Sequence, residues 1–418
     1  MPDDISSPRV SARPQMTAAE RSATINLAGI FGLRMMGMFI ILPVFALYAE
    51  TIPGGGDRFW VGMALGIYGL TQALLQVPFG WASDRFGRKR LIYIGLLVFA
   101  LGSFVAAWAP TVFWVVVGRT LQGVGAISGV VIALAADLTR PEVRTRAMAV
   151  IGITIGTTFA LSLMAGPVLK NWIGVPGIFV LTGILALVAL GVVRYRVPEP
   201  QKVSHDRRVE LRDFNKVLMD PHLLRLNIGI LSLHAILMAL FVQVPFDLRT
   251  AGLVAESHWQ VYLPVLVGSV LLMMPAIRRI DQPRYGRWMF SGAIAVLLLA
   301  QALLMFSHQN LIWLVVALLV FFTAFNLLEA TLPALVSKQA PVTLKGTATG
   351  VYSSLQFLGA FIGAAVGGAL AQHWGDRAVF ALCLGLSLVW LIASLTAPRE
   401  QASDVRDQGS DDSPYRLG

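Results

Sequence analysis

Residues 60–109 decide the fold, because they place a short basic loop between two long apolar runs. The stretch reads WVGMALGIYGLTQALLQVPFGWASDRFGRKRLIYIGLLVFALGSFVAAWA. Each run has about 20 residues, the length that an α-helix needs to cross the ~30 Å hydrocarbon core of a bilayer. Both runs are continuously apolar instead of alternating with a period of two. They therefore predict membrane-spanning helices and not barrel strands.

The same pattern recurs along the 418 residues, of which 56% are hydrophobic and only 13% charged. A soluble domain carries about 25% charged residues, so the composition excludes a soluble multidomain enzyme and a disordered protein. A disulfide scaffold is excluded because Cys383 is the only cysteine. Twelve spans are predicted, at 24–49, 60–83, 91–109, 112–137, 147–170, 176–193, 223–248, 259–277, 288–307, 311–337, 343–371 and 377–397.

Basic residues set the orientation. With a cytoplasmic N-terminus, 26 of the 33 Lys and Arg residues fall in cytoplasmic segments and 4 on the opposite side. This asymmetry follows the positive-inside rule and predicts that both termini are cytoplasmic. It also explains the net charge of +10 without nucleic-acid binding, which we do not expect.

Six spans, a charged linker and six further spans predict two lobes. The expected units are a disordered cytoplasmic tail (1–23), an N-terminal six-helix lobe (24–193), a cytoplasmic linker (194–222), a C-terminal six-helix lobe (223–397) and a second cytoplasmic tail (398–418). An all-α membrane protein built from two such lobes has the architecture of a transporter with a central site between them.

The loop from Gly80 to Arg90, GWASDRFGRKR, resembles the loop signature of the major facilitator superfamily. The segment RTLQGVG, from Arg119 to Gly125, is similar to the arginine-bearing signature of its proton-coupled members. The chain thus resembles the drug:proton antiporter-like branch, and segments such as 326–333 and 345–357 resemble its YajR-type inner-membrane transporters. The resemblance covers about residues 24–397.

The resemblance implies a gate in this loop. In the family the aspartate, here Asp84, faces the N-terminus of the eleventh span, which here is at Lys345-Gly346-Thr347. Free N–H groups and the helix dipole at that end would stabilise a carboxylate. The arginine, here Arg88, is implied to pair with an acid that matches Asp137. Such a contact between lobes would hold the outward-open state. The expected gating residues are Gly80, Asp84, Arg85, Gly87, Arg88 and Asp137.

Four ionisable residues lie deep inside predicted spans: Arg34, Arg119, His234 and Glu329. A charge there costs about 3 kcal/mol, so each is a functional candidate. Glu329 is the only acid well inside a predicted span. Burial favours the neutral form of a carboxyl group, and an imidazole titrates near neutral pH, so Glu329 and His234 are the candidates for proton coupling.

Structural roles stay open for all four residues. The arginines could bond backbone carbonyls within a lobe, His234 could be a packing residue, and Glu329 could form a permanent ion pair. Amides inside the spans need polar partners and are better candidates for a binding cavity than the aromatic residues. The expected cavity residues are Arg34, Arg119, Gln122, Gln243, Asn326 and Gln356.

No phosphate-binding loop, His/Cys metal cluster or nucleophile triad occurs in the sequence, so we expect no enzyme activity, metal or cofactor. The sequence favours a monomeric, multi-pass transporter of a bacterial inner membrane that moves a small organic molecule. The most favoured mode is proton-coupled efflux by alternating access. The alternatives are proton-coupled uptake of a sugar or nutrient and a transport-inactive sensor of the same fold.

Overall fold

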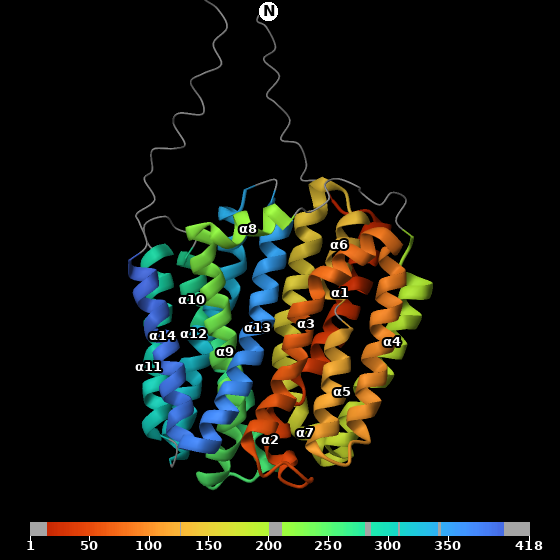
Figure 1. Ribbon diagram of the computed structural model, residues 1–418. Coiled ribbons are helices and arrows are strands. Elements are labelled where there is room, and N and C mark those ends of the chain that lie inside the picture. The colour runs from red at the N-terminus through yellow and green to blue at the C-terminus, as the bar shows by residue number, and fades with distance from the viewer. Residues whose placement is uncertain are drawn as a thin grey trace, which may run out of the picture.

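The computed structural model describes residues 15–125, 127–199, 211–280, 286–307, 310–341 and 344–396. These residues form α-helices and one short 3₁₀ helix (Figure 1). The first half contains α1 (Ala18–Phe39), α2 (Leu42–Ala49), α3 (Arg58–Phe86), α4 (Arg88–Ala107), α5 (Val112–Val124), α6 (Ser128–Asp137) and α7 (Pro141–Arg196). The linker holds α8 (Leu211–Met219), and the second half contains α9 (Pro221–Thr250), η1 (Ala255–Ser257), α10 (Trp259–Ile280), α11 (Gly286–Ser307), α12 (Leu311–Gln339), α13 (Lys345–Trp374) and α14 (Asp376–Leu395).

The predicted all-α membrane fold is confirmed. Eleven helical segments of the described chain are long and apolar enough to cross a membrane. One of them, α7, has 56 residues, which at 1.5 Å per residue is about 84 Å and far longer than one span needs. Its backbone breaks at Gly174, where φ is 69°, a conformation that favours glycine. This helix therefore covers the fifth and sixth predicted spans, which makes twelve in all.

Two spans are interrupted. The first divides between α1 and α2 at Ile40 and Ile41, next to Pro43 in the first turn of α2. The fourth divides between α5 and α6 after Gly125. Interrupted helices in lipid are tolerated where other groups of the protein satisfy the freed backbone. Both breaks lie inside the N-terminal lobe, and the break at Gly125 bears directly on the candidate site.

The first helix begins inside the predicted N-terminal tail. The first helix begins at Ala18, ahead of position 24, because Thr17 and Glu20 form a reciprocal capping box. The linker likewise contains α8 and the first turn of α9, and α7 continues to Arg196. The other expected tail and linker residues, at 1–14, 200–210 and 398–418, lie outside the described part of the chain.

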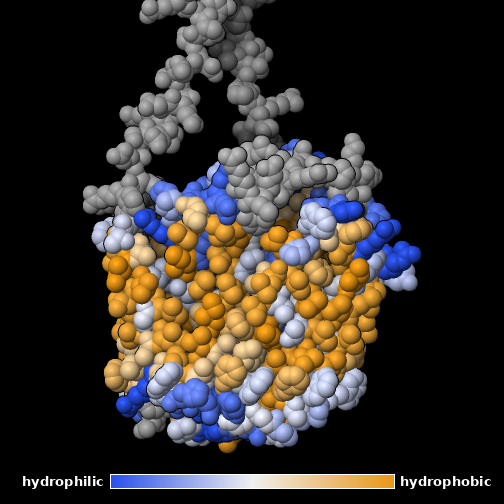
Figure 2. Space-filling view, in the orientation of Figure 1, coloured by the Kyte–Doolittle hydropathy of each residue, from blue (hydrophilic) through white to orange (hydrophobic). Residues whose placement is uncertain are grey.

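The surface matches a bilayer. Figure 2 shows a broad hydrophobic belt between two polar ends of the molecule. Large apolar side chains such as Leu74, Leu271 and Val389 are more than 60% exposed in this belt. Because lipid replaces water around such a belt, this exposure is the expected arrangement for a polytopic membrane protein.

Each half of the chain packs into a lobe, and the two lobes meet mainly along α3 and α13. These two helices approach closely because glycine residues of α3 face backbone carbonyl groups of α13. A Cβ atom at Gly62 would lie 2.2 Å from the carbonyl oxygen of Ala364, and one at Gly69 would lie 2.5 Å from that of Phe357. Small residues allow such approaches between membrane helices. The contacts lie in the half of α3 that begins at Arg58.

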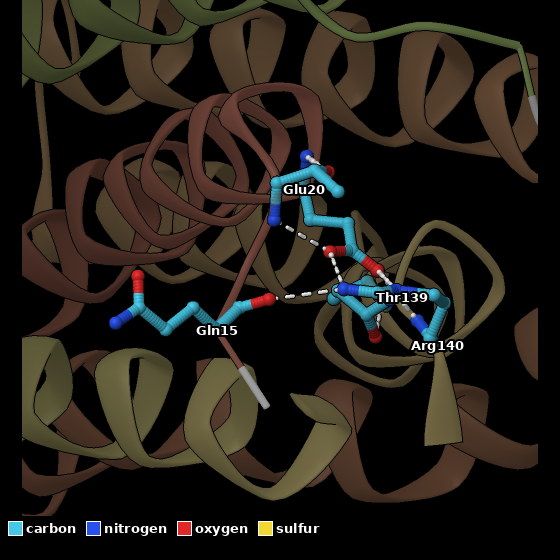
Figure 3. Close-up of polar contacts among 6 residues, drawn as sticks. Gln15, Glu20, Thr139 and Arg140 are labelled. Atoms are coloured by element: carbon cyan, nitrogen blue, oxygen red, sulfur yellow. Dashed lines mark hydrogen bonds and ion pairs between the residues drawn. The ribbon is translucent and has the colours of Figure 1, made fainter. Parts of the chain in front are cut away.

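At the opposite end of the N-terminal lobe, one carboxylate joins the start of α1 to the start of α7. Glu20 Oε1 accepts hydrogen bonds from Arg140 N at 3.0 Å and from Nε at 2.9 Å, and Gln15 O accepts one from Nη2 at 3.0 Å (Figure 3). Hydrogen bonds to Glu20 raise the pKa of the Arg140 guanidinium, so it stays charged at any physiological pH.

Candidate functional site

His234, Glu329 and Gln356 come together from α9, α12 and α13 of the C-terminal lobe. Gln356 Nε2 donates to Glu329 Oε1 at 3.1 Å and to His234 Nε2 at 2.9 Å. An imidazole nitrogen accepts a hydrogen bond only when it carries no proton, so this His234 is neutral with its proton on Nδ1. That Nδ1 atom lies 3.9 Å from Glu329 Oε2. An approach of about 1 Å would bring the pair within hydrogen-bond range.

The two titratable side chains of this cluster differ in their exposure. The side chain of His234 is 5% exposed and that of Glu329 is 31% exposed. His234 Nδ1 and Glu329 Oε2 are both buried atoms without a hydrogen bond in the described chain. Two unsatisfied atoms that face each other across 3.9 Å could share one proton after a small movement.

Arg34 of α1 is bonded entirely inside the N-terminal lobe. It donates from Nε to the carbonyl oxygen of Gly125 at 3.1 Å, from Nη1 to Ser128 Oγ at 2.5 Å, and from Nη2 to Gln72 Oε1. The first bond satisfies a carbonyl that the break between α5 and α6 releases. This geometry matches the structural role that the sequence leaves open for a membrane arginine.

Arg119 of α5 is completely buried and also bonds within its own lobe. It donates to the carbonyl oxygens of Ala64 and Gly37 and to Gln122 Oε1. The Nη2 atom has no hydrogen-bond partner, but the guanidinium lies 4.9 Å from the ring centroid of Tyr68. Gln122 in turn donates to Ser103. Neither arginine forms a hydrogen bond or ion pair with Glu329 in the described chain.

Four of the expected gating residues meet around the junction of α3 and α4: Asp84, Gly87, Arg88 and Asp137, the last residue of α6. Arg88 Nε lies 3.0 Å from Asp137 Oδ2, and Arg88 Nη1 pairs with Asp84 Oδ1. Gly87 connects the helices with a φ of 97°, which a residue with a side chain rarely adopts. The side chain of Asp84 is 57% exposed in this arrangement. No hydrogen bond or ion pair joins it to residues 344–347.

Three further expected residues, Gly80, Arg85 and Asn326, make other contacts. Gly80 accepts a hydrogen bond from Ser83 Oγ at 2.7 Å, and Arg85 lies over the rings of Trp81 and Phe86. Asn326 donates to Ser269 Oγ at 2.9 Å, which joins α12 to α10. The two lobes therefore divide the expected cavity residues between separate clusters.

Gln243 belongs to a cluster that the sequence does not predict. Its Oε1 accepts a hydrogen bond from Arg58 Nη1 at 2.7 Å, and the same nitrogen lies 2.7 Å from Asp376 Oδ1. Gln243 Nε2 also donates to Asp247 Oδ1 at 2.7 Å. The guanidinium of Arg58 lies 4.2 Å from the ring centroid of Phe246. The cluster connects the first residue of α3 with α9 and α14 of the other lobe.

Further polar contacts between the lobes lie at this same end, which we call the Arg58 end. Arg249 binds Glu50 through both oxygens, at 2.5 and 3.1 Å. Lys170 Nζ lies 3.3 Å from Glu256 Oε1. The Arg58 end is therefore the joined end of the two lobes in this structure.

These clusters combine buried ionisable side chains with ion pairs between helices. No group of three or more His, Cys, Asp or Glu residues that could hold a metal ion occurs among the described residues. Buried ionisable groups in two six-helix lobes, with ion pairs at their junction, are typical of a secondary transporter.

The chain belongs to the Major Facilitator Superfamily, whose family model matches residues 27–364 and 266–417. It is a transporter and not an enzyme, as the sequence predicts. The inner membrane transport protein YajR of Escherichia coli is 42% identical over 385 residues, which are 91% of this chain and 84% of that protein.

Two further proteins extend the similarity. The multidrug resistance protein 2 of Bacillus subtilis is 26% identical over 392 residues, 88% of this chain and 94% of that protein. A bacterial homologue of the human lysosomal transporter Spinster, solved in an inward-facing and occupied conformation, has the same fold. Its TM-score is 0.71 at 13% identity, with 91% of this chain and 97% of that chain covered.

Proposed function

We propose that this transporter exports a small organic molecule across a bacterial inner membrane, as a monomer, in exchange for protons. The observation that carries the proposal is the cluster of Glu329, His234 and Gln356 in the C-terminal lobe. A carboxyl group and a neutral imidazole face each other at 3.9 Å beside an amide that binds both. Intramembrane acids and histidines in such pairs are typical of proton pathways.

The cluster supports coupling because protonation changes its contacts. A charged Glu329 is stabilised by protonated His234 or by water, whereas a neutral Glu329 is compatible with a dry, closed site. Rocking of the two lobes alternates these surroundings, so the proton is bound in one state and released in the other. The similarity to a multidrug resistance protein favours efflux.

We further propose the orientation that the basic residues predict, with both termini cytoplasmic and the Arg58 end periplasmic. This structure would then be closed toward the periplasm. Single cysteines at positions 6 and 410 should not react with an impermeant maleimide in intact cells, whereas Trp108→Cys, at the Arg58 end, should react. Cys383 is buried and should not contribute. Labelling of either tail from outside would refute the orientation.

The transport proposal is tested with purified protein in liposomes. Ethidium, a labelled sugar and a labelled amino acid are each offered with and without an imposed pH gradient. We expect ethidium to accumulate in liposomes with an acidic lumen. This accumulation should stop when the pH gradient is collapsed. Accumulation of the sugar or amino acid alone, in the direction of proton flow, would support uptake and contradict efflux.

A further inference from the structure

Asp247 is a buried acid at the Arg58 end, separate from the cluster at Glu329. Only 2% of its surface is exposed. Its Oδ1 atom accepts one hydrogen bond, from Gln243 Nε2, while Oδ2 is buried with no hydrogen-bond partner in the described chain. A charged carboxylate without partners for one oxygen is costly inside a protein. The site is thus better suited to a neutral carboxyl group.

The count of charges at this junction leads to the same conclusion. Among the described residues, Arg58 is the one cation in direct polar contact with the cluster, and its Nη1 atom is already paired with Asp376. Asp247 reaches Arg58 only through the neutral amide of Gln243. One guanidinium therefore faces two acids, and the charges balance when one of the acids is protonated. The side chain of Asp376 is 44% exposed to solvent, so the buried Asp247 is the acid to be neutralised.

Other charged and titratable groups around Asp247 leave this balance unchanged. Tyr262 of α10 is a neutral phenol, and its buried hydroxyl has no hydrogen-bond partner in the described chain. Arg249 is held by Glu50, which follows α2. His258, next to η1, contacts the carbonyl oxygen of Leu253 at 3.2 Å. From α13, Gln372 accepts from the backbone N–H of Arg58 and does not titrate.

We infer that Asp247 is a second proton-binding site, which carries a proton while the lobes are joined at the Arg58 end and releases it to water when that end opens. The inference rests on the lobe movement of the proposed function, but not on Glu329 as the proton carrier. Acid pH then favours the joined state and alkaline pH favours the open one. The proton on Asp247 contributes a change in the ratio of the two states of at most about tenfold for each pH unit.

The experiment measures the joined state directly. Spin labels on Trp108→Cys and Trp374→Cys place one probe on each lobe at exposed positions of the Arg58 end. Distances are recorded for the full chain in lipid nanodiscs between about pH 5.5 and 8.5, because burial favours the neutral form of a carboxyl group above its usual acid range. The short-distance population should fall as the pH rises. In Asp247→Asn, which is neutral at every pH at this position, the part of this fall that Asp247 supplies should be lost, and in the double variant with Glu329→Gln the population should stay at its acid value throughout.

Two control variants separate this site from other titrating groups. His258→Gln should keep the pH response of the wild type, and Glu329→Gln should keep the part of that response that Asp247 supplies. A wild-type distribution that does not change with pH would overturn the inference, as would a full response in Asp247→Asn. If Asp247→Asn does not fold, loss of the response in either control variant would still overturn it. A response that survives in Glu329→Gln supports the Asp247 site even if Glu329 proves not to drive transport.

Discussion

Arg58 Nη1 lies 2.7 Å from Asp376 Oδ1, so the first residue of α3 in one lobe is paired with the first residue of α14 in the other. The same nitrogen donates to Gln243 of α9. Residues far apart in the sequence thus form one polar junction at the point where α3 and α13 pack most closely. A junction of this kind stabilises one arrangement of the lobes over the other.

Removing either charge of this pair should weaken the joined state. The side chains of Arg58 and Asp376 are 25% and 44% exposed, so solvent screens the pair. We therefore expect each of Arg58→Gln and Asp376→Asn to cost about 1 kcal/mol, roughly a fivefold change in the ratio of states. Distances between labels at Trp108→Cys and Trp374→Cys measure this ratio. Unchanged distributions in both variants would show that the pair does not hold the lobes together.

An added methyl group between the lobes should also weaken the joined state. In Gly62→Ala the new Cβ would lie 2.2 Å from the carbonyl oxygen of Ala364, which is far closer than van der Waals contact. Overpacking costs about 1–3 kcal/mol, so the open population should rise at least fivefold in the same distance measurement.

Gly359→Ala is the matched control for Gly62→Ala. Its Cβ would lie 2.2 Å from the carbonyl oxygen of Leu231, a contact between α13 and α9 of one lobe. We expect a lower thermal unfolding midpoint with no change in the balance of lobe states. Equal shifts of that balance in both variants would mean that the contact between α3 and α13 is not specific to the joined state.

Asp84→Asn should move the balance toward the joined state and lower transport. In this structure Asp84 is more than half exposed, and its one ion pair among the described residues is with Arg88, so neutralising it costs the joined state little. In the opposite state its carboxylate is expected to bind the free N–H groups at Gly346 and Thr347, which is worth about 0.3–1 kcal/mol at an exposed helix end. Label distances that match the wild type would remove Asp84 from the gate.

The sequence predicts the membrane fold well because lipid imposes a length and a polarity on every span. The first and fourth spans appear continuous by hydropathy, yet both contain breaks, because Pro43 and Gly125 act on the backbone without interrupting the apolar run. The early start of α1 is readable in the capping box from Thr17 to Glu20, a local pattern that counting of apolar residues does not detect.

The candidate site is less predictable because its contacts join distant segments. Hydropathy identifies His234 and Glu329 but not their common partner Gln356. In the sequence, Arg58 and Asp376 do not differ from other charges near the ends of spans. Their pairing is visible only in the folded structure. Asp247 falls near the end of its predicted span, where an acid is unremarkable, whereas α9 continues to Thr250 and buries it.

The most direct test of proton coupling compares wild type and Glu329→Gln in liposomes that are offered ethidium from outside. Glutamine keeps the size and hydrogen bonding of Glu329 but cannot cycle a proton. We predict that the variant fails to accumulate ethidium when a pH gradient is imposed, while exchange of ethidium across liposomes without a gradient continues near the wild-type rate. Accumulation against the concentration gradient at the wild-type rate would contradict the proposal and show that Glu329 is a structural acid.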